Sequence, residues 1–154
     1  RGPELNQATE TSSADWVARN WPTKPFIISE TGAGAIDGDR SANDSRWSEE
    51  YQALVDGLDA GIAMNSSEIA GIALWQFTDI KVDQPNASTN RPGGINNKGV
   101  LDRWRRPKLS ATQVAGIFGV CESKAGLRTR RMVGPYLPRA SIVTTDTLSI
   151  RASA

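Results

Sequence analysis

One carboxylate of this 154-residue chain stands where chemistry could occur. Glu30 directly follows the mainly apolar run 26–29 and precedes residues 31–34, which are small enough to turn sharply or to let a ligand approach the backbone. An apolar run without polar alternation is typical of a strand that a parallel sheet buries on both faces. A carboxylate at the end of such a strand is costly to bury without partners. Glu30 is therefore either catalytic or ion-paired with an arginine of the surrounding structure, and its position alone leaves both interpretations open.

The elements that must position Glu30 alternate along the chain. Apolar periodicity predicts helices over residues 5–21 and about 48–64 and a last helix that starts near Lys108, while apolar runs predict strands over 26–29 and 69–77. The order helix, strand, helix, strand, helix, without hairpin signals, favours a parallel α/β sheet. Two strands can neither close a barrel nor form a stable sheet alone. The pattern therefore predicts part of an α/β domain and, by itself, no function.

The second predicted helix has an apolar face. Residues on one face of a surface helix recur three or four positions apart and pack against the core. The residues of this helix that we expect to face the sheet are Tyr51, Leu54, Val55, Leu58 and Ile62.

Charge divides the chain near residue 120. Residues 1–120 carry 12 basic and 15 acidic side chains, whereas residues 121–154 carry 6 basic and 2 acidic ones. The second segment has no hydrophobic period, so we predict a basic, irregular and disordered tail over 121–154 after a domain of residues 1–120. A basic arm for nucleic acid is the less favoured alternative, because Tyr136 is the tail's only aromatic side chain. No membrane partner is expected either, since no apolar run approaches the roughly 18 residues of a membrane span.

Other features leave the cellular location open. The chain begins at Arg1 rather than at a methionine, so we expect it to start partway through a longer protein, and a missing signal peptide is uninformative. Cys121 is the single cysteine of the sequence, so an internal disulfide framework is excluded. Asn-x-Ser triplets at Asn43, Asn65 and Asn86 would suit a secreted protein, but such triplets arise often by chance.

The residues around Glu30 resemble a known signature. Residues 24–33 read Lys-Pro-Phe-Ile-Ile-Ser-Glu-Thr-Gly-Ala and are similar to the seventh-strand signature of glycoside hydrolase family 2, especially of its β-glucuronidases. Further motifs of the family follow in order: Trp-Ser-Glu-Glu-Tyr-Gln at 47–52, Trp-Gln-Phe-Thr-Asp at 75–79, Asn-Asn-Lys-Gly-Val at 96–100, Asp-Arg at 102–103 and Arg-Pro-Lys at 106–108. The resemblance covers residues 8–120. It implies that the chain holds about strands 7 and 8, with flanking helices, of a (β/α)8 or TIM barrel, which takes about 250 residues when complete.

The resemblance assigns roles to five residues. Family members are retaining glycosidases, in which one carboxylate attacks the anomeric carbon and a second carboxyl group protonates the leaving oxygen. Glu30 would be the nucleophile. Trp75 would be an apolar platform for a sugar ring or else a plain core tryptophan, and Asp79 would bind a hydroxyl group or cap its loop. Asn96 and Lys98 would contact the carboxylate of a uronic acid, for which a lysine ammonium is a suitable charge-assisted partner.

The chain also departs from the family's pattern. The family's general acid/base lies in an Asn-Glu pair, and no such dipeptide occurs here. Thr31 and Gln76 stand where the family usually has tyrosine and asparagine, which puts the exact sugar in doubt. The resemblance thus implies a segment of a retaining β-glycosidase with a carbohydrate substrate, expected to be a β-glucuronide, and without a metal or other cofactor. A β-galactosidase-type member and a non-catalytic remnant are the alternatives; the isolated chain is expected to be inactive, and the parent enzyme could be a homo-oligomer.

Overall fold

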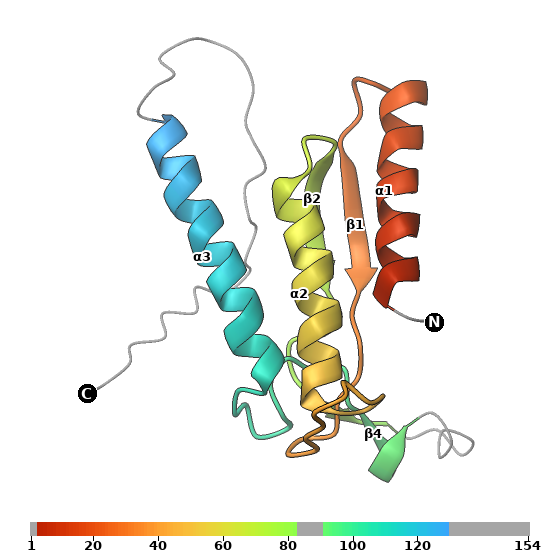
Figure 1. Ribbon diagram of the computed structural model, residues 1–154, viewed down its shortest axis with the longest axis vertical. Coiled ribbons are helices and arrows are strands. Elements are labelled where there is room, and N and C mark those ends of the chain that lie inside the picture. The colour runs from red at the N-terminus through yellow and green to blue at the C-terminus, as the bar shows by residue number, and fades with distance from the viewer. Residues whose placement is uncertain (1–2, 83–90, 130–154) are drawn as a thin grey trace.

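The order of helices and strands follows the predicted alternation. The computed structural model describes residues 3–82 and 91–129. Its elements are, in chain order, α1 (Pro3–Asn20), β1 (Phe26–Thr31), α2 (Glu49–Asn65), β2 (Ile69–Leu74), β3 (Ile80–Lys81), the 3-10 turn η2 (Pro92–Gly94), β4 (Ile95–Asn96) and α3 (Leu109–Thr129). Figure 1 shows α1 and α2 standing on either side of β1 and α3 beyond α2.

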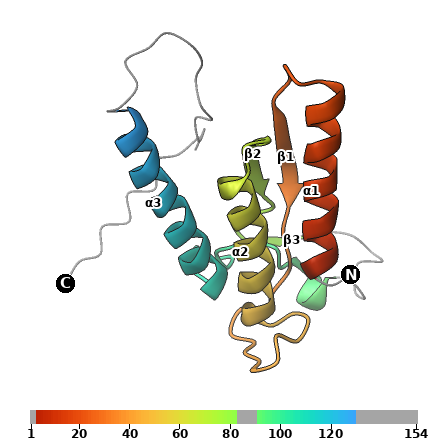
Figure 2. The same ribbon diagram turned by 45° about the horizontal axis from the view of Figure 1, so that its top comes forward.

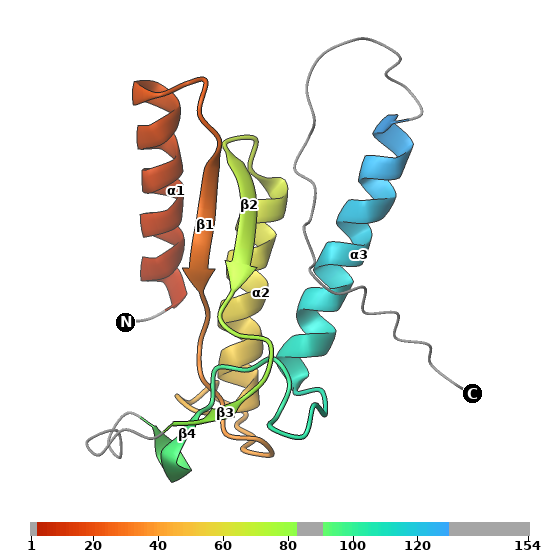
Figure 3. The same cartoon turned by 180° about the vertical axis from the view of Figure 1, so that it is seen from behind.

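The strands β1 and β2 form a parallel pair. Their register runs from Phe26 opposite Ile69 to Thr31 opposite Leu74, so the predicted parallel arrangement is confirmed. Figure 3 shows both strands in front of α2, with α1 beside β1. The other face of the pair carries Ile27, whose side chain is 56% exposed. Within the described part of the chain the helices cover one face of the strands only, so burial on both faces stays a prediction for a complete barrel.

A small apolar core lies between the strands and the first two helices. Ala14 of α1, Ala63 of α2, Ile28 of β1 and Ile69 of β2 are buried together. The two alanines let the helices approach the strands closely, and each buried isoleucine stabilises the fold by roughly 1.5–3 kcal/mol. This core fixes the direction of β1 and with it the end at which Glu30 lies.

Beyond Leu74 the chain leaves the parallel pair, three residues before the predicted end of that strand. Residues Ile80–Lys81 form β3, which pairs antiparallel with β4 at Ile95–Asn96. The sequence contained no hairpin signal, and this second sheet was not predicted. Its two-residue strands are too short to show the alternation by which a strand is recognised.

The helix α2 begins where Ser48 caps it. The Ser48 hydroxyl accepts a hydrogen bond from the Tyr51 N–H over 3.1 Å. Glu49 and Glu50 add negative charge to the first turn, where the helix dipole favours it. The predicted helix over residues 48–64 is thus confirmed to within one residue at each end.

The inward face of α2 is partly polar. Val55 is buried as predicted, but Leu54 is 37% exposed, so the expectation that it faces the sheet is wrong. Gln52, Asp56 and Asp59 are buried instead. A hydropathy pattern assigns such residues to solvent, whereas their partners here are Thr31 of β1, Ser110 of α3 and backbone groups of the loops that follow the strands.

The helix α3 extends past the predicted domain boundary. It starts at Leu109, as expected, and continues to Thr129, so the prediction of irregular structure from residue 121 is wrong for residues 121–129. That stretch includes Glu, Lys, Ala, Leu and Arg, which favour helix even where no apolar period is present. The rest of the predicted tail, 130–154, lies outside the described residues, and the division into domain and tail stays a prediction. Among the described helices, α3 included, none combines the length and apolar character needed to cross a bilayer.

Candidate active site

The loops that follow β1 and β2 meet at one end of the molecule. Because the strands are parallel, their carboxyl ends lie at the same edge, and Figures 1 and 2 show the following loops gathered there near the start of α2. The Trp75 N–H donates a hydrogen bond to the Thr31 carbonyl over 2.6 Å. The residue after Glu30 and the first residue after β2 are therefore joined directly.

Glu30 is exposed at the end of β1. Its neighbour Thr31 is directed toward α2, where the threonine hydroxyl donates to Oδ2 of Asp59 over 2.6 Å. The register of the strand pair is irregular between Ile28 and Thr31, so the regular alternation of faces is interrupted beside Glu30. The expected burial of this carboxylate is not observed, and no ion pair among the described residues includes it. Of the two interpretations, the arginine pairing is thus absent from the described part of the chain.

Lys98 lies against the loop that follows Glu30. Its Nζ donates to the Gly32 carbonyl over 3.2 Å. Its own carbonyl accepts from the Gln76 N–H over 2.9 Å. Lys98 is half-buried between the ends of the two strands, and its ammonium group sits on the residue two positions after Glu30.

Trp75 remains accessible at the same edge. Its side chain is 43% exposed. Gly32 lies so close to the Trp75 backbone, with a φ of +144°, that a Cβ there would be 2.6 Å from the Trp75 carbonyl oxygen. A glycine is required at this position, and it allows the loop after β1 to pass directly beside Trp75.

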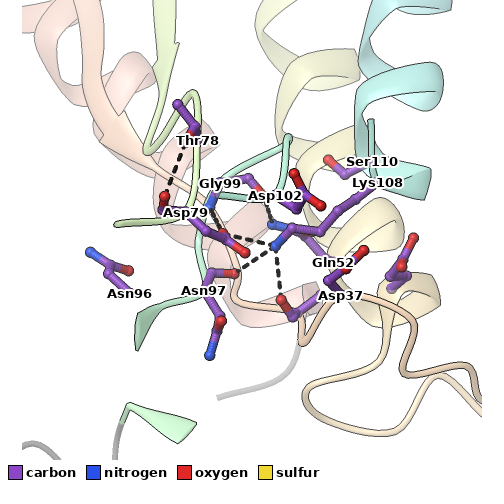
Figure 4. A network of polar contacts seen from close by, with 12 residues as sticks. Asp37, Gln52, Thr78, Asp79, Asn96, Asn97, Gly99, Asp102, Lys108 and Ser110 are labelled. Carbon is purple, nitrogen blue, oxygen red and sulfur yellow. Dashed lines mark hydrogen bonds and ion pairs between the residues drawn. The ribbon is translucent and has the colours of Figure 1, made fainter. Parts of the chain in front are cut away.

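A buried lysine connects these loops to the start of α3. Lys108 is 2% exposed. Its Nζ donates to the Ala35 carbonyl over 2.8 Å. It also donates to Oδ1 of Asp79 over 2.9 Å and to the Asn97 carbonyl over 3.1 Å, as Figure 4 shows. The same Asp79 oxygen accepts from the Gly99 N–H over 2.8 Å. Of the two alternatives for Asp79, this geometry favours the one in which it holds its loop.

Burial makes the Asp79–Lys108 pair costly to break. Burial raises the pKa of the Asp79 carboxyl, and the Lys108 ammonium opposes that rise. Both side chains are almost completely inaccessible to solvent. Removing one partner of such a pair leaves an uncompensated buried charge and typically costs about 3–5 kcal/mol.

Asn96 is buried in β4 but engaged elsewhere. Its Oδ1 accepts from Nη1 of Arg91 over 3.2 Å. Figure 4 shows its side chain apart from Lys108 and Asp79. The structure thus brings Trp75, Lys98 and the Glu30 loop together, while Asp79 and Asn96 have other partners.

The polar face of α2 holds the loop after β1. The Gln52 side-chain amide donates to the carbonyls of Ala33 and Gly99, each over 3.0 Å. Asp56 accepts from the Ala33 N–H over 3.1 Å and from the Ser110 hydroxyl over 2.5 Å. Both α2 side chains therefore hold Ala33, three residues after Glu30.

Three carboxyl groups besides Asp79 also have raised pKa values. Burial raises the pKa of Asp56 to about 6 against hydrogen bonds from Ser110 and Ala33. Burial and the charge of Asp59 raise the pKa of Glu10 to about 7. Burial also raises the pKa of Asp59, although its hydrogen bond with Thr31 works in the opposite direction.

Sequence reasoning did not assign a role to Gln52, Asp56 or Lys108. The spacing of residues 52, 56 and 59 places three polar side chains on one helix face, but a polar face by itself indicates solvent rather than buried partners. Lys108 belonged to a recognised motif, which assigned it no role of its own. In the described ranges, no group of three or more His, Cys, Asp or Glu residues could hold a metal ion.

The chain is similar to known carbohydrate-cleaving enzymes. It is 35% identical to the β-glucuronidase of Mus musculus over 111 residues, and this match covers 71% of this chain and 16% of that protein. It is 30% identical to the β-glucuronidase of Paenibacillus borealis over 108 residues, and this match covers 68% of this chain and 17% of that protein. No protein-family model matches the chain.

Solved structures agree with these relatives. A glycoside hydrolase family 2 β-galacturonidase from Eisenbergiella tayi bound to galacturonate matches with a TM-score of 0.68 and 33% identity, over 74% of this chain and 21% of that chain. The chain matches a segment of the family 2 β-glucuronidases and β-galacturonidases. A second such structure is the Bifidobacterium dentium β-glucuronidase complexed with coumarin-3-O-glucuronide, with a TM-score of 0.63 and 26% identity over 80% of this chain and 18% of that chain.

The chain spans about a sixth of the length of the curated relatives it matches. The predicted resemblance to family 2, and especially to its β-glucuronidases, is confirmed. The described part of the segment is a mixed α/β piece with short sheets, which agrees with part of a family 2 domain. The closed barrel and the roles of the individual residues stay predictions.

Proposed function

We propose that this chain supplies part of the active site of a retaining β-glycosidase that acts on β-glucuronides, with Glu30 as the nucleophile. One contact carries the proposal: the Lys98 ammonium lies on the Gly32 carbonyl, two residues after Glu30. A cation suited to a uronate carboxylate thus contacts the loop that directly follows the candidate nucleophile. The similarity to β-glucuronidases supports the reaction class.

The proposed reaction divides between this chain and residues outside it. An oxygen of Glu30 would bond to the anomeric carbon as the glycosidic bond breaks, and the leaving oxygen would take a proton from a second carboxylic acid. In retaining enzymes the two carboxyl groups are about 5–5.5 Å apart. Water, deprotonated by that second residue, would then cleave the glycosyl ester and release Glu30. Glu30 is exposed at the loop end of β1, where a sugar would reach it, and the acid/base residue would come from elsewhere in the barrel.

The uronic acid is the most specific part of the proposal. A β-galactosidase-type enzyme would bind a neutral sugar and would have no use for the Lys98 charge. Glucuronides and galacturonides both carry the carboxylate and differ in configuration at C4. The E. tayi structure bound to galacturonate makes a β-galacturonide the second candidate.

The other predicted site residues would contribute in different ways, two by contact with the sugar and one indirectly. Trp75 would support the sugar ring, since its side chain remains accessible. Asn96 would donate from its amide nitrogen to the carboxylate, since its amide oxygen is engaged by Arg91. Asp79 would act through its ion pair with Lys108 and would not touch the sugar.

The isolated chain should not turn over glycosides. Positioned acid/base catalysis typically supplies about 10²–10⁴-fold, and the sugar would lack most of the surfaces that hold it in line with the nucleophile. The exposed Ile27 on the open face marks where further barrel strands would pack. The test of function therefore needs the full-length protein that carries this segment.

The experiment compares kcat/KM for nitrophenyl β-glucuronide, β-galacturonide, β-glucoside and β-galactoside. We expect a preference for a uronide over both neutral sugars. Glu30→Gln should lower kcat by about 10³-fold or more, because the loss of a covalent nucleophile acts on this scale in other hydrolases. Glu68→Gln is the matched control, since Glu68 is exposed just before β2, at the other end of the sheet.

The outcomes separate the alternatives. Full activity in Glu30→Gln would contradict the nucleophile assignment. A preference for β-galactosides would replace the substrate and keep the reaction class. A full-length protein without glycosidase activity on any of the four substrates would favour the non-catalytic remnant.

A further inference from the structure

Lys108 joins the two loops that the proposed active site uses. Its Nζ donates to the carbonyl of Ala35, five residues after Glu30, and to the carbonyl of Asn97, between Asn96 and Lys98. One ammonium group therefore spans the loop of the candidate nucleophile and the loop of the candidate uronate-binding residues.

The two loops also touch each other at this point. The Ala35 N–H donates to the Asn97 carbonyl over 2.8 Å, the same carbonyl that accepts from Lys108. The Lys108 N–H donates to the Val100 carbonyl over 3.0 Å, which anchors the lysine backbone just after the second loop. The distance between the loops is thus set by a short chain of hydrogen bonds with Lys108 at its centre.

A buried lysine at position 108 is not expected to stabilise the fold more than an apolar residue of similar volume would. A buried ammonium is costly, and apolar residues of similar volume often replace a buried ion pair without loss of stability. An apolar side chain could fill the volume, but it could not hold two carbonyl oxygens at fixed positions. Directional contacts are what the lysine adds, and Asp79 compensates its charge.

We infer that Lys108 is a positioning residue for uronate selectivity, because it fixes the Asn96–Lys98 loop relative to Glu30 through the carbonyls of Asn97 and Ala35. The inference rests on the proposed function, since it presupposes that Lys98 binds the uronate. Lys108 does not touch the substrate in this account; it acts through the two loops.

The test is the ratio of kcat/KM for the preferred uronide to kcat/KM for the matching neutral glycoside, measured on the full-length protein. Lys108→Met keeps most of the side-chain volume and removes all three side-chain hydrogen bonds. A displacement of about 1 Å can cost up to 10²-fold, so we expect the ratio to fall by about 10-fold or more. A variant that merely folded less well would lose activity on both substrates alike and leave the ratio unchanged.

Two further variants complete the design. Lys24→Met is the matched control, because Lys24 is exposed before β1, at the opposite end of the strand, and should leave the ratio unchanged. The double variant Lys108→Met with Asp79→Asn leaves no unpaired buried charge and keeps an acceptor for the Gly99 N–H, so it should fold even if the single variant does not. Its ratio should fall as well.

The two proposals fail in distinguishable ways. A wild-type protein without uronide preference would overturn the proposed function and this inference together. A wild-type protein with that preference, and an unchanged ratio in the Lys108 variants, would overturn the inference alone. Hydrogen exchange at the Ala35 N–H gives a second readout that needs no substrate. In the double variant this amide should exchange faster, while the exchange rates of the α2 amides stay as in the wild type. Unchanged protection of the Ala35 N–H would count against the inference.

Discussion

The two halves of α2 bind the rest of the molecule by different forces. In the first half, Gln52 and Asp56 hold the backbone of Ala33 with hydrogen bonds. In the second half, Ala63 packs against Ile28 and Ile69. Hydrogen bonds are directional and contribute about 1 kcal/mol net each, whereas apolar burial is non-directional and supplies most of the stability. The polar half therefore sets where the loops lie, and the apolar half keeps the sheet on the helices.

This difference predicts two classes of variant. Changes at the loop end, from Gly32 to Ala35 and around Lys98 and Lys108, should alter substrate selectivity or loop geometry. Changes in the apolar core should alter the free energy of unfolding and leave selectivity as it was. The variants below test this division from the largest expected effect to the smallest.

Lys98→Ala should have the largest effect on selectivity. It would leave the uronate charge unpaired, and removing one partner of a buried charge pair costs about 2–5 kcal/mol. We expect kcat/KM of the full-length protein for the uronide to fall by roughly 30-fold to several thousand-fold, with little change for neutral glycosides. Lys24→Ala is the control, and an equal loss on all sugars would mean that Lys98 only holds its loop in shape.

Ile28→Ala should have the opposite signature. Ile28 is in the core with Ala14, Ala63 and Ile69, and truncation of a buried isoleucine costs about 2–5 kcal/mol. Denaturant unfolding should show this loss, while the kcat/KM ratio of uronide to neutral glycoside should stay at the wild-type value. A changed ratio in the protein that remains folded would break the proposed division between the two halves.

Gly32→Ala tests the close approach of the loop to Trp75. An added Cβ would lie 2.6 Å from the Trp75 carbonyl oxygen. Gly38 also has a positive φ, of +80°, but has open space around the position of a Cβ. Gly38→Ala should cost about 1–2 kcal/mol from backbone strain alone, and Gly32→Ala should cost more. If both variants lost the same free energy of unfolding, the loop would be able to move away from Trp75 without a cost in stability.

The raised carboxyl pKa values predict a modest pH dependence of stability. The pKa of Glu10 is raised from 4.5 to about 7 and that of Asp56 from 3.8 to about 6. Between these limits the native state binds more protons than the unfolded chain, so the free energy of unfolding should fall as the pH rises from about 4 to 7. Glu10→Gln should flatten this slope, measured by urea unfolding across that range, and Glu68→Gln should not. An unchanged slope in Glu10→Gln would show that Glu10 titrates normally.

The sequence predicted the elements better than their packing. The helix at 48–64 and the strand at 26–29 were recognisable because local periodicity and the Ser48 cap define them. The parallel pairing followed from their alternation. The exposed face of β1 agrees with the prediction that this chain, taken without the rest of a barrel, leaves apolar strand faces uncovered.

The loop end was predicted in part. Motifs indicated Glu30, Trp75 and Lys98, and the structure brings the lysine and the tryptophan to the loop after Glu30. The inward turn of Asp56 and the burial of Lys108 could not be read from hydropathy, since each depends on partners more than 50 residues away in the chain or on backbone groups. Polar burial of this kind is decided by tertiary geometry, which no local pattern contains.

The most direct test of the central claim is to trap the covalent intermediate. A 2-deoxy-2-fluoro uronyl fluoride slows hydrolysis of the ester that a retaining enzyme forms, and its good leaving group reduces the need for the acid residue. After incubation of the full-length protein and digestion, mass spectrometry should find the added sugar on the peptide that carries Glu30. Uronide activity together with an adduct on a different carboxylate would contradict the account.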